Sequence, residues 1–210
     1  MLFRSMRVLD LGCGKALTSV FLARQFDARV FATDLWIDAT ENLRRIADAG
    51  EEERVVPIHA DARHLPFAHE FFDRIVSFDA FHYFGTDDLL LGELVRYVRP
   101  DGLIGIVVPG TLEEIDEVPP AHLAEWWQPD FATFHSPEWW RRHWERSGAV
   151  DVDVAAVVPD GWAHWLLWSE ACDDWAIAHG RAAFRREAAM LRADEGRTFA
   201  FVKVVARPRG

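Results

Sequence analysis

The sequence is poor in cysteine and in long apolar runs, and both absences exclude classes of protein. Two cysteines among 210 residues cannot build a framework of disulfide bonds. Cys13 and Cys172 also lack the spacing of zinc ligands, so we expect no metal site and two buried or unreactive thiols. No stretch approaches ~18 uninterrupted apolar residues, and the N-terminus lacks the apolar run of a signal peptide. These absences predict a cytoplasmic protein without a membrane segment.

Positive charge is scarce as well. The chain has 23 lysine and arginine residues against 34 aspartate and glutamate residues, a formal net charge of −11. Nucleic-acid-binding proteins need a basic patch or stripe, whereas the short pairs Arg141-Arg142 and Arg185-Arg186 are each followed by acidic residues. The charge therefore predicts no nucleic-acid partner, and it favours a cationic ligand over an anionic polymer.

Apolar residues make up 50% of the chain and charged residues 27%, which is typical of a globular protein. At this length we expect a single domain over residues 1–210. The first hundred residues alternate between strand-like and helix-like segments. The expected strands are 8–11, 29–33, 55–58, 72–78 and 103–108, and the expected helices are 16–25, 37–49 and 87–98. This alternation predicts an α/β fold with a parallel sheet and helices on both faces.

The second half of the chain has a different pattern. Residues 109–137 are rich in acids and proline and predict a long excursion over the surface. In the stretch "SPEWWRRHWERSG", Ser136 is the expected N-cap of a helix, Pro137 its first residue and Gly148 its stop. A strand over 150–158, a mostly helical segment over 165–192 and a final strand over 198–206 follow. We therefore divide the domain into a nucleotide-binding half, 1–108, and a tryptophan-rich half, 109–210.

The stretch "RVLDLGCGKALTS", residues 7–19, predicts a buried strand, a glycine turn and the start of a helix. Gly12 and Gly14 have no Cβ to obstruct a ligand, and the helix N-terminus beyond them offers unpaired N–H donors. Asp34 ends the second strand, in "VFATDLW", where a doubly wound fold places the acid that binds ribose hydroxyls. Together these features predict an adenosine-type ligand.

Two pyrophosphate-binding alternatives each lack a required residue. A nicotinamide-type turn needs a third glycine where Leu17 stands. A P-loop needs a glycine at the position of Leu9, and a serine or threonine at that of Ala16.

Five stretches in order resemble the class I S-adenosylmethionine-dependent methyltransferases: "VLDLGCG", "ATDLW", "HADARHLPF", "FDRIVSFDAFHYF" and "VRPDGLIGIVV". The resemblance covers about residues 7–108. It implies a doubly wound, Rossmann-like seven-stranded sheet in the order 3-2-1-4-5-7-6, whose last strand, 198–206, is antiparallel, with helical insertions in the C-terminal half. It also implies S-adenosylmethionine as the methyl donor and S-adenosylhomocysteine as the product.

The resemblance implies donor-binding roles at matching positions. It implies that Asp10, Gly12, Cys13 and Gly14 contact the methionine end of the donor and that Asp34 and Leu35 contact the ribose. It also implies that Asp61 and Ala62 contact the adenine and that Phe78 lies beside the methionine amine. One departure is Ala16, which stands where a third alternating glycine is common in the family. We expect alanine to be tolerated there, because it is small and suits a helix.

The acceptor site is expected after the fourth strand and among the tryptophans. His82 is the candidate base, with Asp79 and Tyr83 in the same loop as further candidate catalytic residues. Nine of the ten tryptophans lie in the second half. We expect Trp139, Trp140, Trp144 and Trp165 to line a pocket for a planar aromatic or cationic small molecule, the alternative being that such rings fill the core.

The expected function is methyl transfer from S-adenosylmethionine to an oxygen, nitrogen or carbon atom of a small molecule. The alternatives are a catalytically silent binder of the same nucleotide that acts through a partner and, less favoured, a nicotinamide-dependent oxidoreductase. Family members usually carry one or two helices before the first strand, whereas "MLFRSM" precedes it here. We expect the tryptophan-rich insertions or a second subunit, in a homodimer, to cover the donor site.

Overall fold

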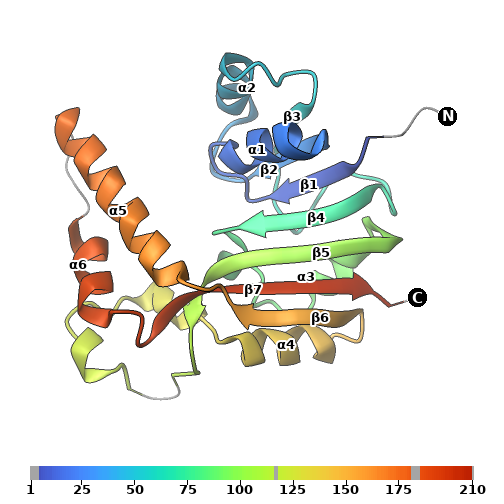
Figure 1. Ribbon diagram of the computed structural model, residues 1–210. Helices are drawn as coiled ribbons and strands as arrows, with labels where there is room; N and C mark the ends of the chain where they lie inside the picture. The colour runs from blue at the N-terminus through green and yellow to red at the C-terminus, as the bar shows by residue number, and fades with distance from the viewer. Residues whose placement is uncertain (1–4, 116–117, 181–184, 210) are drawn as a thin grey trace.

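The computed structural model describes residues 5–115, 118–180 and 185–209 and contains one seven-stranded sheet (Figure 1). The strand order is β3-β2-β1-β4-β5-β7-β6, and β7 is antiparallel to both of its neighbours. The expected order and the antiparallel last strand are therefore confirmed. The strands are β1 (Arg7–Leu11), β2 (Arg29–Asp34), β3 (Val55–His59), β4 (Phe72–Phe78), β5 (Val98–Thr111), β6 (Val150–Val157) and β7 (Phe199–Pro208).

Apart from α3, which lies behind β5 and β7 in this view, the α-helices gather at three places around this sheet (Figure 1). The first two lie at the end of the sheet formed by β1, β2 and β3, and α4 runs along β6 at the other end. The last two project beyond the sheet on the side opposite to the chain termini. The α-helices are α1 (Leu17–Phe26), α2 (Ala39–Asp48), α3 (Leu90–Val95), α4 (Pro137–Arg146), α5 (Gly161–Ala178) and α6 (Arg185–Asp194), and the 3₁₀ helices are η1 (Phe81–Tyr83), η2 (Ala121–Leu123) and η3 (Pro129–Thr133).

Helix α4 begins and ends where its capping residues predict. The Ser136 hydroxyl accepts a hydrogen bond from the backbone N–H of Trp139 at 3.2 Å, and Pro137 is the first helical residue. Gly148 follows the helix with φ +69°, a left-handed conformation that glycine adopts without strain.

The structure corrects three expected boundaries. Helix α3 is shorter than the expected 87–98, because the Asp87 side chain accepts from the Leu89 backbone N–H and forms a turn before the helix. Ala16 is the N-cap of α1 rather than its first residue, and its φ of +61° is left-handed. The segment expected to be helical over 165–192 contains two helices, and residues 181–184 between them lie outside the described residues.

The main core lies where the middle of the sheet meets α4. Trp140 and Trp144 are four residues apart on one face of α4, and both are fully buried. The Phe81 ring lies 6.0 Å from the Trp140 ring and 5.8 Å from the Trp144 ring, measured between centroids. The expectation that these two tryptophans line a substrate pocket is therefore wrong, because packing leaves neither indole accessible. Truncation of a large core residue of this kind typically costs about 3–5 kcal/mol of stability.

None of the helices in the described part of the chain combines the length and apolar character needed to cross a membrane. The parallel strands β1, β2, β3 and β4 end at the same edge of the sheet, beyond which α5 and α6 project (Figure 1). Crevices at such an edge are where α/β sheets bind their ligands.

Candidate functional site

The glycine turn between β1 and α1 borders open space. Gly12 has φ +73° and Gly14 has φ +53°, so both adopt the conformation that favours glycine. A Cβ added to Gly12 would lie 2.5 Å from the Cβ of Ala80, in the link between β4 and η1. A Cβ added to Gly14 would meet no atom within 4 Å. Gly12 is therefore required by packing within the protein, and Gly14 leaves room above the backbone for a ligand.

Asp34, at the end of β2, holds this turn in place. Its Oδ2 accepts a hydrogen bond from the Gly14 backbone N–H at 2.8 Å, and its Oδ1 accepts from the N–H groups of Trp36 and Ile37, each at 2.8 Å. The residue is 8% exposed, so part of it still reaches the crevice. Carboxylate oxygens can accept more than one hydrogen bond, which leaves capacity for ribose hydroxyls at this position.

Asp10 lies beneath the turn and is fully buried. Its Oδ2 accepts hydrogen bonds from the hydroxyls of Thr18 at 2.7 Å and Ser19 at 2.6 Å, and these bonds tie β1 to α1. Its Oδ1 is buried without a hydrogen-bond partner among the described residues. Burial raises the pKa of this carboxyl above its ordinary value. In this structure Asp10 supports the turn from below rather than presenting its carboxylate to the crevice.

The residues expected near the adenine and ribose end adjoin Asp34. The backbone N–H of Ala60 donates to the Asp34 carbonyl at 3.0 Å, which joins the ends of β2 and β3. Asp61 follows on the surface, and its carboxylate accepts from the Arg63 backbone N–H at 2.9 Å. Leu35 has an exposed side chain, and Ala62 packs in part against the main core. The structure therefore brings Asp34, Leu35, Asp61 and Ala62 together at two adjacent strand ends.

The candidate catalytic residues lie beyond the end of β4, where Phe78 is exposed. His82 is 2% exposed, and its Nδ1 has no hydrogen-bond partner in the described part of the protein. Its ring packs against Tyr83, 4.0 Å between centroids, and Phe134, at 5.5 Å. Burial lowers the pKa of His82 to about 4, so the imidazole is neutral at pH 7. A neutral, buried imidazole can accept a proton only weakly at this pH.

Tyr83 lies in the same loop. The ring is half exposed and meets the Trp36 ring edge-on at a centroid distance of 5.1 Å. Burial and the nearby carboxylates of Asp79, Asp130 and Glu187 raise the pKa of its hydroxyl above the ordinary value. Asp130 comes from η3 and Glu187 from α6, so three distant segments place acids around one tyrosine. Sequence patterns did not identify Asp130 or Glu187, because no motif marks acids in inserted segments.

Asp79 itself has an unusual pKa and backbone conformation. The surrounding protein and the Glu187 carboxylate raise its pKa to about 6 from an ordinary 3.8, although part of the side chain is exposed to solvent. Its φ of +54° is left-handed, a conformation that asparagine tolerates well.

Asp79→Asn is therefore expected to unfold at a higher temperature than the wild type at pH 7.5, by about 2 °C after allowing for solvent screening. Between about pH 4 and pH 6 the folded wild type binds more protons than the unfolded chain, so its stability falls as pH rises through this window. Asparagine carries no charge and avoids that loss. Thermal unfolding from pH 4 to pH 8 checks this: the advantage should vanish near pH 4, and a difference that is constant with pH would contradict it.

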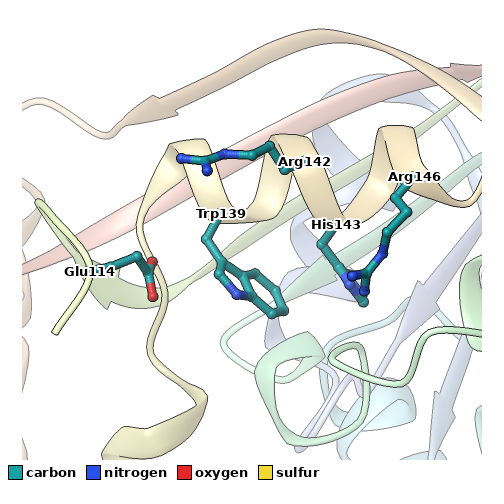
Figure 2. A pocket seen from close by; sticks show the side chains of 5 residues that line it. All are labelled: Glu114, Trp139, Arg142, His143 and Arg146. Atoms are coloured by element: carbon teal, nitrogen blue, oxygen red, sulfur yellow. The ribbon is translucent and has the colours of Figure 1, made fainter. Parts of the chain in front are cut away.

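The predicted tryptophan wall is only partly accessible. Trp139 lines a cavity of about 330 Å³ with Glu114, Arg142, His143 and Arg146. Figure 2 shows Trp139 and His143 pointing side by side from α4, with the Glu114 carboxylate directed toward them. The indole stacks on the His135 ring, at 3.6 Å between centroids, and on the His143 ring, at 4.6 Å. These two rings occupy stacking surface of Trp139 that a planar ligand would need.

Trp165 is 7% exposed and packs in a separate core cluster under η2 and η3. The expectation that it lines an acceptor pocket is therefore wrong, for the same reason as at Trp140 and Trp144. The neighbouring Trp168 was not singled out as a site residue, yet it is 62% exposed and lines a second cavity, of about 390 Å³.

The two cysteines differ in exposure. Cys13 is 7% exposed, and burial together with the Asp10 and Asp34 carboxylates raises the pKa of its thiol. Cys172 is exposed on α5 and lines the second cavity, so of the two expected alternatives, a buried or an unreactive thiol, burial does not hold for it. In the folded protein we expect Ellman's reagent to modify one thiol within minutes and the second only in guanidinium chloride. Release of two equivalents of thionitrobenzoate from the native protein would contradict this assignment.

Comparison with known proteins agrees with this arrangement. Residues 8–102 match the family described as "Methyltransferase domain". The methyltransferase GfsG of Streptomyces halstedii is 36% identical over 113 residues, which are 52% of this chain and 41% of that protein. The chain therefore spans less than half the length of this relative.

Among solved structures, phosphoethanolamine N-methyltransferase 2 of Haemonchus contortus, in complex with S-adenosylmethionine, has a TM-score of 0.77 at 17% identity, covering 100% of this chain and 50% of its own. The [4+2]-cyclase SpnF has a TM-score of 0.74 at 18% identity, covering 100% and 77%. These likenesses are to the fold. With the sheet order, the glycine turn and the domain match over residues 8–102, the chain is similar to the class I S-adenosylmethionine-dependent methyltransferases.

Proposed function

We propose that the protein transfers a methyl group from S-adenosylmethionine to a small-molecule acceptor. The observation that carries this proposal is the open space above Gly14, bordered by Asp34 on one side and by the loop after β4 on the other. A strand–glycine turn–helix with an acid at the next strand end suits an adenosyl ligand. The residues present therefore fit S-adenosylmethionine, and the Leu17 side chain argues against a dinucleotide turn.

In this proposal each donor-binding residue has a defined task. The backbone at Gly12, Cys13 and Gly14 receives the methionine end, because Gly14 presents no side chain to it. Asp34 binds the ribose hydroxyls while it fixes the Gly14 N–H. Asp61 and Ala62 contact the adenine at the end of β3, and Phe78 contributes backbone contacts beside the methionine amine.

The bound donor supplies an electrophilic methyl group on a sulfonium, which an acceptor atom attacks in line. The protein aligns the acceptor and shapes the charge around it, because little other covalent assistance is needed. Asp79, His82 and Tyr83 lie after β4 on the acceptor side, as expected for such a role. Of these, Asp79 is best placed to take a proton near neutral pH, since its pKa is about 6 and that of His82 is about 4.

Titration calorimetry with S-adenosylhomocysteine, and with NAD as the control ligand, tests the donor assignment. Mass spectrometry with a trideuteromethyl donor and a panel of small acceptors then tests the transfer. Tight binding of S-adenosylhomocysteine and a product 17 mass units heavier than its acceptor are expected. Binding without any product across oxygen, nitrogen and carbon acceptors would favour a silent binder of the nucleotide. Binding of NAD in its place would overturn the assignment.

We also propose that the protein works in the cytoplasm and that a second copy helps to cover the donor site in a homodimer. The support for the second point is the exposed apolar surface near the turn, which includes Leu17, Phe21 and Trp36. Light scattering coupled to size-exclusion chromatography measures the oligomeric state, and a monomer with a solvent-open donor site would overturn the dimer.

A further inference from the structure

Two acids line the cavity of about 390 Å³, Asp173 on α5 and Glu187 on α6. Glu187 also lies close enough to Asp79 and Tyr83, in the loop after β4, to influence the ionisation of both. We call Asp173 and Glu187 the acceptor carboxylates.

Asp173 is the most informative member of this group. It is 8% exposed, lines the cavity and makes no hydrogen bond or ion pair with the residues that the structure describes. A buried carboxylate without a partner is costly, and such groups are normally paired or bind a ligand. The adjacent Glu187 accepts a hydrogen bond from the Ser169 hydroxyl and forms no ion pair within the described residues. Among the residues that the structure describes, neither of these two carboxylates has a cationic partner.

Among the described residues, Arg186 is the cation that lines the cavity, and it is engaged elsewhere. Its guanidinium donates a hydrogen bond to the Glu125 carbonyl oxygen at 2.9 Å and lies 5.9 Å from the centre of the Trp126 ring. It makes no ion pair with a described carboxylate. With two carboxylates and one such guanidinium, the described lining of the cavity is negative and attracts a cation.

The kind of cation follows from the spacing of the acids and from the rings among them. Within the described chain, no three His, Cys, Asp or Glu side chains come together closely enough to hold a metal ion. Trp168, which is 62% exposed, lines the cavity together with the acceptor carboxylates. An aromatic face beside separate carboxylates suits an organic ammonium ion, which makes cation–π contacts and has a diffuse charge. The volume of about 390 Å³ suits a small molecule.

Resting on the methyl transfer proposed above, we propose that the acceptor is a small amine that binds as an ammonium ion in this cavity, between the acceptor carboxylates and the Trp168 indole. The ammonium first gives its proton to an acceptor carboxylate. The nitrogen lone pair then forms an N–C bond with the methyl carbon as the S–C bond breaks, and that bonding pair stays on sulfur. The sulfonium becomes a neutral thioether, and the product nitrogen carries the positive charge.

The test compares choline with its neutral carbon isostere, 3,3-dimethylbutan-1-ol, in the presence of saturating S-adenosylhomocysteine. Choline cannot be methylated on nitrogen, so calorimetry reports binding alone. We expect choline to bind at least about tenfold more tightly than the alcohol. Alkylation of Cys172 by iodoacetamide gives a second readout, because this thiol lines the same cavity and should react more slowly when choline is bound.

The double variant Asp173→Asn, Glu187→Gln should bind choline at least about tenfold more weakly and keep its affinity for S-adenosylhomocysteine unchanged. Asp174→Asn is the matched control, because Asp174 is exposed next to Asp173 and does not line the cavity. Trp168→Leu removes the aromatic ring at an exposed position without disturbing a core. The affinity for choline should fall about threefold or more. This variant keeps the test decisive even where the double variant fails to fold.

Equal binding of choline and the alcohol, or unchanged choline binding in the variants, would overturn the amine proposal. The proposal would also be overturned if the double variant bound S-adenosylmethionine more weakly but kept its affinity for S-adenosylhomocysteine and for choline. The acids would then bind the sulfonium of the donor. A protein that fails to bind S-adenosylhomocysteine would overturn the proposed function itself, which is a separate result.

Discussion

Asp34→Ala should raise the dissociation constant for S-adenosylhomocysteine by about 30-fold or more. The carboxylate accepts hydrogen bonds from the backbone N–H groups of Gly14, Trp36 and Ile37, and in the proposed complex also from the ribose hydroxyls. Hydrogen bonds to a charged group contribute about 1.5–3 kcal/mol each, and ~2 kcal/mol is about 30-fold in affinity. The loss should be larger than for one ribose contact, because the turn that receives the methionine end loosens as well.

Calorimetry on the wild type and the variant measures this effect. Asp34→Asn keeps the shape of the side chain, and its dissociation constant should lie between those of the wild type and Asp34→Ala. Asp38→Asn is the control: Asp38 is exposed, and its side chain accepts from the Thr40 N–H as the N-cap of α2, a role that asparagine fills equally well. Unchanged affinity in Asp34→Ala, in a protein that melts cooperatively, would remove Asp34 from the donor site.

Alanine at the two glycines of the turn should separate stability from binding. In Gly14→Ala the new Cβ meets no protein atom within 4 Å, so folding loses only the cost of a left-handed alanine, about 1–2 kcal/mol. The methyl group would occupy the space assigned to the donor, so S-adenosylhomocysteine should bind at least about 100-fold more weakly. In Gly12→Ala the same left-handed strain is joined by a contact of 2.5 Å with the Ala80 Cβ, and stability should fall by about 3 kcal/mol or more.

Chemical denaturation and calorimetry on both variants check this pair. Gly92→Ala is the baseline, because Gly92 lies within α3, has room for a Cβ and should gain about 0.5–1 kcal/mol of stability on replacement. Normal binding by Gly14→Ala would mean that the donor lies away from the turn. A Gly12→Ala variant as stable as the wild type would mean that the link between β4 and η1 moves aside without cost.

The donor half of the site was predictable from the sequence because its signals are local. The glycines and Asp34 lie at strand ends, where hydrophobic strands in fixed order make register and edge predictable. Ala16 shows the limit even there. It was expected inside α1, but the third position of the turn is left-handed, so this alanine takes a conformation that suits glycine.

The acceptor half was less predictable because its residues meet only through the tertiary fold. The spacing of Trp140 and Trp144 fits a helix face that lines a pocket, and it fits equally well a helix face that packs against the sheet. In the structure both rings pack against Phe81, so they belong to the core. Asp173 and Glu187 carry no local signal, since each lies in an inserted segment and they meet at one cavity only because α5 and α6 lie side by side. The exposed Trp168 differs from the buried Trp165 by three positions on one helix.

The insertion of α5 and α6 between β6 and β7 also has a consequence for the order of folding. Strands β6 and β7 are antiparallel neighbours, and β7 pairs with β5 as well, so residues 199–208 must be present before the sheet can close. Such long-range pairings are slow to form because loop closure precedes the contacts that compensate for it. The donor-binding strands β1, β2 and β3 pair through shorter connections. We therefore expect the nucleotide-binding half to gain hydrogen-exchange protection first during refolding, and α5, α6 and β7 to gain it last.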